Sequence, residues 1–305
     1  MNVREALRAA IERLTSAQVP SASTTAEVLL MHVLRRDRTF LHAHPEWEMI
    51  PDEERSYRQL LEKRAAGTPT QYLTGKQEFW GLSLQVKPGV FIPRPETEHV
   101  VEKALEIVRE RLKRADARIV DVGTGSGCIA LALALELPEA EVVATDVSDD
   151  ALAVARRNAE TLGLSARVQF VQSDLFEAFL SHHGQASADF DTRAFDLVVS
   201  NPPYVSPGEA ERLPREVREH EPDAALFSEG EGLEVTRRLI EEARGVLVGG
   251  GPGLRSPQGV GGWLVLELGY QMAGRVKALV GDAWAEVEVT NDLAGIPRVL
   301  AARKK

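Results

Sequence analysis

The sequence predicts an α/β protein with a mainly parallel sheet, preceded by a small helical domain. From residue 96 onward, apolar segments of strand length alternate with longer segments of helical pattern, as in parallel strands joined by right-handed crossovers. Before residue 76, apolar residues instead recur at three-to-four spacing, which is typical of short amphipathic helices. The 305 residues therefore divide into a helical domain at 1–75, a hairpin or linker at 76–95 and an α/β domain at 96–305.

Composition and charge disfavour several classes of protein. With 44% hydrophobic and 27% charged residues, the chain has enough apolar side chains for a sizeable core. No apolar run approaches the ~18 residues of a membrane span, and charges occupy the N-terminal stretch that a signal peptide would keep apolar. The single cysteine, Cys128, cannot form an internal disulfide, so a reducing, cytoplasmic location is expected.

The charge of the chain is unevenly distributed. The net charge is −10, yet residues 1–90 hold 12 Lys and Arg against 11 Asp and Glu, a balance of +1. The acidity therefore lies in the second part of the chain. Neither part has the basic excess expected of a protein whose main partner is the bare phosphate backbone of a nucleic acid.

The helical and hairpin segments follow from local patterns. Val3, Leu7, Ala10, Ile11 and Leu14 predict a first helix, and apolar residues at 28–34 predict a second. A third helix is expected at 52–66, after Pro51 and before Gly67, with acidic residues in its first turn. Alternation over 78–86, with Gly81 near the turn, predicts a small hairpin.

The α/β domain is expected to begin with a helix and to end with two strands that could form an edge hairpin. Its predicted strands are 118–122, 141–145, 167–171, 195–200, 263–268, 285–290 and 298–302, and its predicted helices are 96–114, 127–137, 149–162 and 231–246. Two segments are expected to be loops. Residues 181–194 are polar and mixed, and residues 249–262 contain seven glycines and two prolines, so this second segment is expected to be mobile.

The strongest local signal is a buried strand that runs into alternating glycines and then a helix, residues Asp121-Val122-Gly123-Thr124-Gly125-Ser126-Gly127-Cys128. Glycines permit a tight turn and a close ligand, and free N–H groups at the helix start attract negative charge. Asp146 ends the next predicted strand, where a carboxylate can accept hydrogen bonds from ribose hydroxyls. The pattern therefore predicts an adenosine-containing ligand, although it fits neither the nicotinamide fingerprint nor a P-loop.

Two further candidates follow the third strand of the domain. Asp174 lies where a carboxylate could meet the adenine amine, and the alternative is a helix-capping aspartate. Leu175 could cover the adenine ring or belong to the core.

A proline-braced tetrapeptide, Asn201-Pro202-Pro203-Tyr204, follows the fourth strand. The planar nitrogen of an amide or aromatic amine is a poor nucleophile because its lone pair is delocalised. If the Asn201 side-chain oxygen and the Pro202 carbonyl each hold one of its hydrogens, the lone pair can be aimed at a methyl group. Tyr204 can stack on the flat substrate group. The alternative interpretation, in which the tetrapeptide has no catalytic role, is a proline turn at the end of a strand.

These motifs together resemble a known family. The glycine loop is similar to the S-adenosylmethionine loop of class I methyltransferases, and Asn-Pro-Pro-Tyr is typical of enzymes that methylate adenine amines or glutamine amides. Four motifs in order, Gln71-Tyr72-Leu73-Thr74-Gly75, Glu78-Phe79-Trp80-Gly81, Ile92-Pro93-Arg94-Pro95-Glu96-Thr97-Glu98 and Asn201-Pro202-Pro203-Tyr204, resemble the release factor glutamine methyltransferase family of the HemK/PrmC type over nearly the whole chain. Leu175 departs from the aromatic residue of some members, and segments 181–194 and 249–262 look inserted.

The resemblance implies a Rossmann-like class I methyltransferase domain with a mainly parallel sheet and an antiparallel edge strand. It implies transfer of a methyl group from S-adenosylmethionine to the amide nitrogen of the glutamine in the Gly-Gly-Gln motif of class 1 peptide chain release factors, which the helical domain helps to hold. The implied donor-binding residues are Gly123, Thr124, Gly125, Ser126, Gly127, Asp146, Asp174, Leu175 and Asn201. The implied catalytic residues are Asn201, Pro202 and Tyr204, joined by Pro203 in holding the substrate.

Rival substrates remain open at this stage. A ribosomal-protein glutamine methyltransferase shares the chemistry, and a DNA adenine methyltransferase shares the fold but should carry a basic recognition domain that residues 1–90 lack. A non-enzymatic adaptor that only binds the donor would leave the tetrapeptide without a use. Arg94 and Glu96 could organise the site, form an internal ion pair or contact substrate. No metal, membrane or sequence-specific nucleic-acid partner is expected, and His99 and His220 are expected to have ordinary surface or capping roles.

Overall fold

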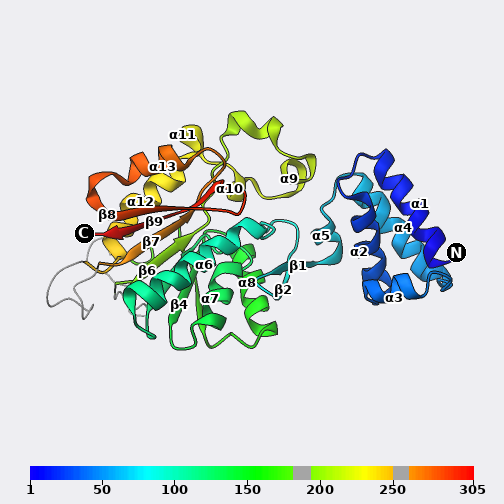
Figure 1. The fold of residues 1–305 in the computed structure, drawn as a ribbon, viewed down its shortest axis with the longest axis horizontal. Coiled ribbons are helices and arrows are strands. Elements are labelled where there is room, and N and C mark those ends of the chain that lie inside the picture. The colour runs from blue at the N-terminus through cyan, green and yellow to red at the C-terminus, as the bar shows by residue number, and fades with distance from the viewer. Residues whose placement is uncertain (181–193, 250–260) are drawn as a thin grey trace. The chain divides into compact units, whose positions relative to one another are not determined.

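The computed structural model describes residues 1–180, 194–249 and 261–305 (Figure 1). The chain forms two compact units, of which the first combines Met1–Lys76 with Leu213–Glu221 and the second combines Gln77–Arg212 with Pro222–Lys305. The division predicted from the sequence placed all residues after 96 in one domain, whereas the short segment Leu213–Glu221 groups with the N-terminal helices. Most of the two predicted loops, 181–194 and 249–262, lies outside the described residues.

The first unit is built from helices around its own small core. They are α1 (Val3–Ser16), α2 (Ala22–Leu34), α3 (Arg38–Ala43), α4 (Pro51–Ala65), α5 (Thr70–Thr74) and α9 (Arg215–His220). Asn2 and Glu5 form a capping box that satisfies free N–H groups at the start of α1. Leu14, Leu29 and Tyr57 are fully buried, and the Tyr57 hydroxyl donates to the Ala26 carbonyl at 2.9 Å, which joins α4 to α2. α3, α5 and α9 do not follow from the sequence patterns.

The second unit contains a seven-stranded sheet in the order β5-β4-β3-β6-β7-β9-β8. Its strands are β3 (Arg118–Val122), β4 (Glu141–Asp146), β5 (Val168–Gln172), β6 (Leu197–Ser200), β7 (Trp263–Glu267), β8 (Trp284–Asn291) and β9 (Pro297–Lys304). The first five strands in that order are parallel, and β9 pairs antiparallel with both β7 and β8. The predicted α/β fold with an antiparallel edge is therefore confirmed.

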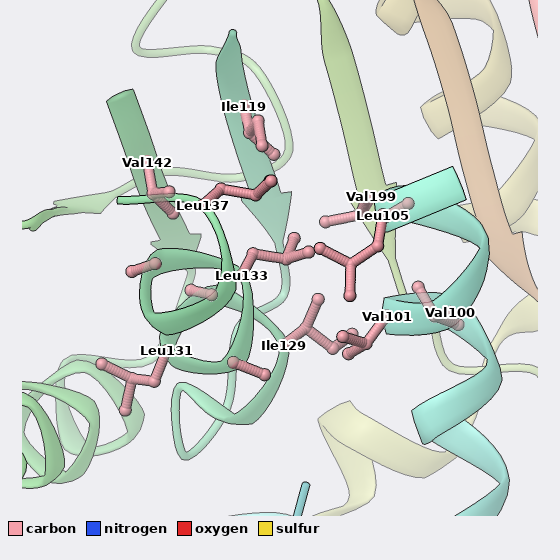
Figure 2. Packing of buried hydrophobic residues seen from close by; sticks show 14 of the residues in the cluster. Val100, Val101, Leu105, Ile119, Ile129, Leu131, Leu133, Leu137, Val142 and Val199 are labelled. Carbon is pink, nitrogen blue, oxygen red and sulfur yellow. The ribbon is translucent and has the colours of Figure 1, made fainter. Parts of the chain in front are cut away.

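Helices cover both faces of this sheet. The helices of the second unit are α6 (Glu98–Glu106), α7 (Cys128–Glu136), α8 (Asp149–Thr161), α10 (Asp223–Leu226), α11 (Glu229–Gly232), α12 (Glu234–Val246) and α13 (Ala273–Val280), with 3-10 turns at Pro95–Thr97, Pro207–Arg212 and Gly281–Ala283. α6 and α7 pack on one face, where Val101 and Leu105 meet Ile129 and Leu133 below the strands (Figure 2). α12 and α13 pack on the other. The alternation of side chains along each strand supplies both apolar layers.

Some boundaries differ from those predicted. The single helix expected at 96–114 consists of the 3-10 turn Pro95–Thr97, α6 and a π-helical segment Ile107–Leu112. The predicted hairpin is present as β1 (Lys76–Phe79) and β2 (Leu82–Gln85), a separate two-stranded sheet whose Leu84 side chain reaches the core beneath α6 and α7. In the part of the chain that the structure describes, no helix is both long and apolar enough to cross a membrane.

Candidate active site

The ends of β3 and β6 bring the two strongest sequence motifs to the same edge of the sheet. The two strands are parallel neighbours, with Val122 opposite Ser200. The Ser200 hydroxyl donates to the Val122 carbonyl at 2.7 Å, which ties the strand ends together. The glycine loop leaves β3 at this point, and Asn201 leaves β6 beside it. The carboxyl ends of parallel strands are where open α/β sheets bind ligands.

The glycine loop depends on left-handed backbone conformations. Gly123, Gly125 and Gly127 have φ values of 71°, 57° and 87°, which only glycine adopts without strain. At Gly127 a Cβ would also lie 3.1 Å from the Cβ of Ala155, so a side chain would crowd α8. At Gly123 and Gly125 a Cβ would meet nothing within 4 Å. The first two glycines therefore border open space, and the third permits close helix packing.

A buried carboxylate lies behind this loop. The Oδ2 atom of Asp121 accepts hydrogen bonds from the Thr124 hydroxyl at 2.6 Å and from the Ala130 N–H at 3.1 Å. Its Oδ1 atom has no hydrogen-bond partner among the described residues. Burial raises the pKa of this carboxyl to about 7. Asp121 belongs to the glycine motif, but the sequence gives it no role in the site. Its buried, unpaired Oδ1 atom is the feature that draws attention to it.

Asp146 lies at the end of β4 and faces the same loop. Its Oδ2 atom accepts the Gly125 N–H and its Oδ1 atom accepts the Ser148 N–H, both at 2.9 Å. Burial raises the pKa of this half-buried carboxyl. The next residue, Val147, exposes 60% of its surface. A carboxylate, that of Asp146, and an exposed apolar side chain, that of Val147, therefore lie next to each other beside the glycine loop.

Asp174 and Leu175 follow β5, the next strand outward. The alternative role of Asp174 as a helix cap is wrong, because turns rather than a helix follow this residue. The Asp174 carboxylate instead pairs with Arg238 of α12 at 3.1 Å. Leu175 has a φ of 47° and is buried in the core layer that includes α12. Its burial supports the core interpretation that the sequence left open.

The tetrapeptide is held from both sides. Pro202 is buried, and the Asn201 side-chain Nδ2 donates to the Thr97 hydroxyl oxygen at 3.2 Å. The Tyr204 ring packs on Gly269, where a Cβ would lie 2.7 Å from Tyr204 Cδ2. Gly232 lies even closer to the Tyr204 backbone, since a Cβ at Gly232 would lie 2.3 Å from the Tyr204 carbonyl oxygen. The loop is therefore fixed by contacts that leave no room for a side chain at either glycine.

A charged cluster surrounds the tetrapeptide. Burial and the nearby carboxylate of Glu267 raise the pKa of Tyr204 to about 12, against the opposing effect of Arg94 and Arg298. Arg298 of β9 lies 3.8 Å from Glu96 and also pairs with Asp292. Arg94 lies over the Phe91 ring, 4.8 Å from its centroid. Of the roles left open for Glu96, the structure supports an internal ion pair.

Besides Asp121, three further residues of the site do not follow from the sequence analysis. Thr97 is buried and lies in a quoted motif, but it had been given no role. Glu267 at the end of β7 is a lone acid in an otherwise apolar strand, a signal that could have identified it. Asn158 of α8 donates from Nδ2 to the Ser126 carbonyl at 2.9 Å and to the Gln85 carbonyl at 3.1 Å. Asn158 therefore ties the glycine loop to the β1–β2 hairpin.

The described residues contain no group of three or more His, Cys, Asp or Glu side chains suited to a metal ion. His99 instead lies 2.9 Å from Glu102 on α6, and the His220 Nε2 atom lies 3.6 Å from the place where a Gly67 Cβ would be.

The fold and the motifs at its sheet edge define a methyltransferase. Family models described as "PrmC N-terminal domain" and "Methyltransferase small domain" match residues 5–75 and 81–231. A release factor glutamine methyltransferase of Koribacter versatilis is 40% identical over 100% of this chain and 99% of its own, and one of Deinococcus radiodurans is 39% identical with the same coverage. The chain belongs to the release factor glutamine methyltransferase family.

The fold is also found in more distant proteins. The crystal structure of the hMettl16 catalytic domain in complex with MAT2A 3′UTR hairpin 6 has a TM-score of 0.54 and 20% sequence identity, and the similarity covers 80% of this chain and 81% of that one. At this identity the likeness concerns the fold alone.

Proposed function

We propose that this protein transfers a methyl group from S-adenosylmethionine to the side-chain amide nitrogen of the glutamine in the Gly-Gly-Gln motif of class 1 peptide chain release factors. One observation carries the proposal: the glycine loop and the Asn-Pro-Pro-Tyr loop leave neighbouring parallel strands at the paired residues Val122 and Ser200. A donor site and an amide site so placed can share one reaction centre. The names of the full-length relatives support the choice of substrate.

The residues around the glycine loop fit the donor. Gly123 and Gly125 border open space, so a ligand can lie against their backbone. Each Asp146 oxygen accepts one backbone N–H and keeps a second lone pair for a ribose hydroxyl. The exposed Val147 offers an apolar surface next to it. Asp121, buried behind the loop, supports it by accepting from the Thr124 hydroxyl and the Ala130 N–H.

Other proposed donor contacts are less direct. Thr124 and Ser126 are buried, so we propose that they contribute their backbone rather than their side chains, together with Gly127 at the start of α7. Asp174 remains exposed enough to accept an adenine amine beside Arg238, and Leu175 supports the core behind it. When bound, S-adenosylmethionine supplies an electrophilic methyl group on a sulfonium centre.

The acceptor is oriented rather than ionised. The Asn201 side-chain oxygen and the Pro202 carbonyl each accept one N–H of the substrate amide, so that the nitrogen lone pair faces the methyl group. Pro202 and Pro203 stiffen this loop, and the Tyr204 ring, held against Gly269, packs on the flat amide. Most of the rate enhancement in this proposal comes from orientation.

The helical unit is proposed to help hold the release factor. The family match at residues 5–75 supports this role, since that model covers the helices and stops before the methyltransferase unit. A ribosomal-protein glutamine or a DNA adenine would use the same chemistry, but no observation on the first unit favours either.

The test is methyl transfer from labelled S-adenosylmethionine to four acceptors. They are a class 1 release factor, the same factor with its Gly-Gly-Gln glutamine replaced, ribosomal proteins and duplex DNA. Label on the intact release factor alone is the expected result. Label on ribosomal proteins or on DNA in its place would replace the proposed substrate, and label on the factor without its glutamine would contradict the proposed target atom.

A variant tests the division between donor and acceptor sites. Asn201→Ala should abolish transfer, because the amide loses one of its two acceptors. Although Asn201 is also an implied donor contact, donor binding should stay largely intact, because the glycine loop and Asp146 carry most of the proposed donor contacts. Isothermal titration with S-adenosylmethionine measures the second property. Asn291→Ala, at the exposed end of β8, is the control. Equal loss of binding and transfer in Asn201→Ala would contradict this division.

A further inference from the structure

The Asn201 side chain has two possible orientations, and only one suits an acceptor role. A carboxamide presents an oxygen on one side and an NH₂ group on the other, and the two differ by a half turn about the last side-chain bond. If the NH₂ group faced the substrate, it would repel the N–H groups that it is required to hold. Some feature of the protein must therefore select the productive orientation.

Thr97 is the side chain that Asn201 meets. The Nδ2 atom of Asn201 lies 3.2 Å from Thr97 Oγ1, and Thr97 is 1% exposed, so no solvent competes for this contact. A hydroxyl group by itself does not discriminate, because it can donate to the oxygen of an amide or accept from its nitrogen. The outcome depends on where the single hydroxyl hydrogen of Thr97 points.

Glu267 decides the direction of that hydrogen. Thr97 is 1% exposed and Glu267 is 5% exposed. Burial raises the pKa of Glu267 to about 7, and a hydrogen bond from the Thr97 side chain opposes that rise. In its ionised form the carboxylate can only accept. The hydroxyl hydrogen is thus used, and Thr97 Oγ1 can only accept from its other neighbour. The neighbouring group must then be the NH₂ of Asn201, which turns the Asn201 oxygen the opposite way.

The charges that face Glu267 come from several elements. The charged groups are Arg94 and Glu96 before α6 and Arg298 of β9, and the neutral titratable groups are Tyr204 of the tetrapeptide loop and Cys128 of α7. Two guanidinium groups oppose part of the effect of burial on the carboxylate, while Glu96 adds to that effect. Glu267 Oε2 has no hydrogen-bond partner among the described residues, and Thr97 is the side chain whose hydrogen bond lowers the pKa of Glu267.

We propose that Thr97 and Glu267 are positioning residues that fix the Asn201 carboxamide with its oxygen toward the substrate amide. The inference rests on the proposed function, because it assigns these two residues to the same acceptor site. Neither residue takes part in bond making. Glu267 orients the Thr97 hydroxyl, and Thr97 in turn orients Asn201.

The first test compares Thr97→Val with Thr97→Ser in transfer to the release factor. Valine keeps the shape of threonine but lacks the hydroxyl, so we expect a loss in kcat of about 10- to 100-fold, the size of one lost orienting hydrogen bond. The Kd for S-adenosylmethionine should stay within about 2-fold. Thr97→Ser keeps the hydroxyl and should retain most of kcat. A Thr97→Val variant with wild-type kcat would overturn the proposal.

A double-mutant cycle separates positioning from general damage to the core. If Glu267 acts through Thr97, Glu267→Gln should lower kcat in the wild-type background and change it by less than about 2-fold in the Thr97→Val background. Losses that multiply would overturn the inference, as would equal losses in Thr97→Ser and Thr97→Val. Thermal unfolding in the presence of S-adenosylmethionine shows that each variant is folded.

The outcomes also distinguish this inference from the function on which it rests. Wild-type protein that fails to label the release factor overturns the proposed function and the inference with it. Wild-type transfer that survives Thr97→Val unchanged overturns the inference alone.

Discussion

Gly269 lies so close to the Tyr204 ring that a Cβ at residue 269 would come within 2.7 Å of Tyr204 Cδ2. The same Cβ would lie 2.7 Å from the Met272 sulfur, so both neighbours confine this position. The thioether can move, because methionine is flexible. The aromatic ring belongs to the tetrapeptide loop, so a shift of the ring would displace Tyr204 from its position in the acceptor site.

Gly269→Ala should therefore disturb the acceptor site more than the fold. Overpacking of this kind costs ~1–3 kcal/mol, and we expect a loss in kcat/KM for the release factor of about 10-fold or more, with little change in the Kd for S-adenosylmethionine. Gly274→Ala is the matched control, since a Cβ there meets nothing within 4 Å and the residue lies in α13. Similar kinetic losses in both variants would contradict the role assigned to the Tyr204 contact.

Asp146 should control donor binding without affecting the fold of the sheet. In Asp146→Asn the carboxylate loses its charge and one of its oxygens, so either the Gly125 or the Ser148 N–H loses its acceptor. A lost hydrogen bond to a charged group is worth ~1.5–3 kcal/mol, and we expect the Kd for S-adenosylmethionine to rise by about 10-fold or more. Asp149→Asn, exposed in the first turn of α8, is the control for charge. Calorimetric titration that gives the same Kd for both variants would refute the assignment.

Glu216 should anchor the segment Leu213–Glu221 to the helical unit. It pairs with Arg64 of α4, which is 5% exposed and whose Nε atom has no hydrogen-bond partner among the described residues. Glu216→Ala leaves a buried guanidinium with a remaining bond to the Thr68 carbonyl at 3.3 Å. Because breaking a buried pair costs ~3–5 kcal/mol and this pair is partly exposed, we expect a loss of stability of ~1–3 kcal/mol.

Limited proteolysis measures this anchoring directly. Glu216→Ala should be cleaved within 213–221 faster than wild-type protein, because the segment opens more often. The control is Glu219→Ala, which removes an exposed partner of Arg215 from the same helix. Equal cleavage of the two variants would show that the Arg64 pair does not hold the segment.

The parts of this structure that follow from local pattern were the parts predicted. The strand at 118–122 was predicted with the bounds that β3 has, since an apolar run followed by Gly123, Gly125 and Gly127 marks both its end and the helix after it. Asn201 and Asp146 were located in the same way, because each ends or follows a strand. Periodicity and breaker residues carry this information within about ten residues.

The parts that depend on distant contacts were not predicted. Thr97 and Glu267 are 170 positions apart in the sequence, and only the packing of the turn before α6 against β7 makes them partners. The segment Leu213–Glu221 likewise joins the helical unit through distant contacts, such as the pair of Arg64 and Glu216, which are 152 positions apart. The order β7-β9-β8 is a third case, since two final strands in sequence do not reveal which one pairs with β7.

Glu267 also makes the stability of the protein depend on pH. Burial raises its pKa from 4.5 to about 7, so the folded protein binds this proton more tightly than the unfolded chain does. The free energy of unfolding should therefore fall as the pH rises from about 4.5 to about 7, by up to ~3 kcal/mol from this group, at 1.36 kcal/mol per pKa unit. Above that window both states are ionised and the penalty is constant.

Glu267→Gln removes this contribution and should flatten the curve. Urea unfolding at pH 5.5 and 7.5 gives the free energy of unfolding of the wild-type protein and of the variant. The pKa of Asp121 is also raised to about 7, but this group titrates in both proteins. The difference between the two proteins in their pH dependence therefore isolates Glu267. We expect wild-type protein to lose more stability than the variant between the two pH values. Parallel curves would contradict the raised pKa. Because the ionised carboxylate is the form that directs the Thr97 hydroxyl, the pH at which the fold is most stable should lie below the pH at which methyl transfer is fastest.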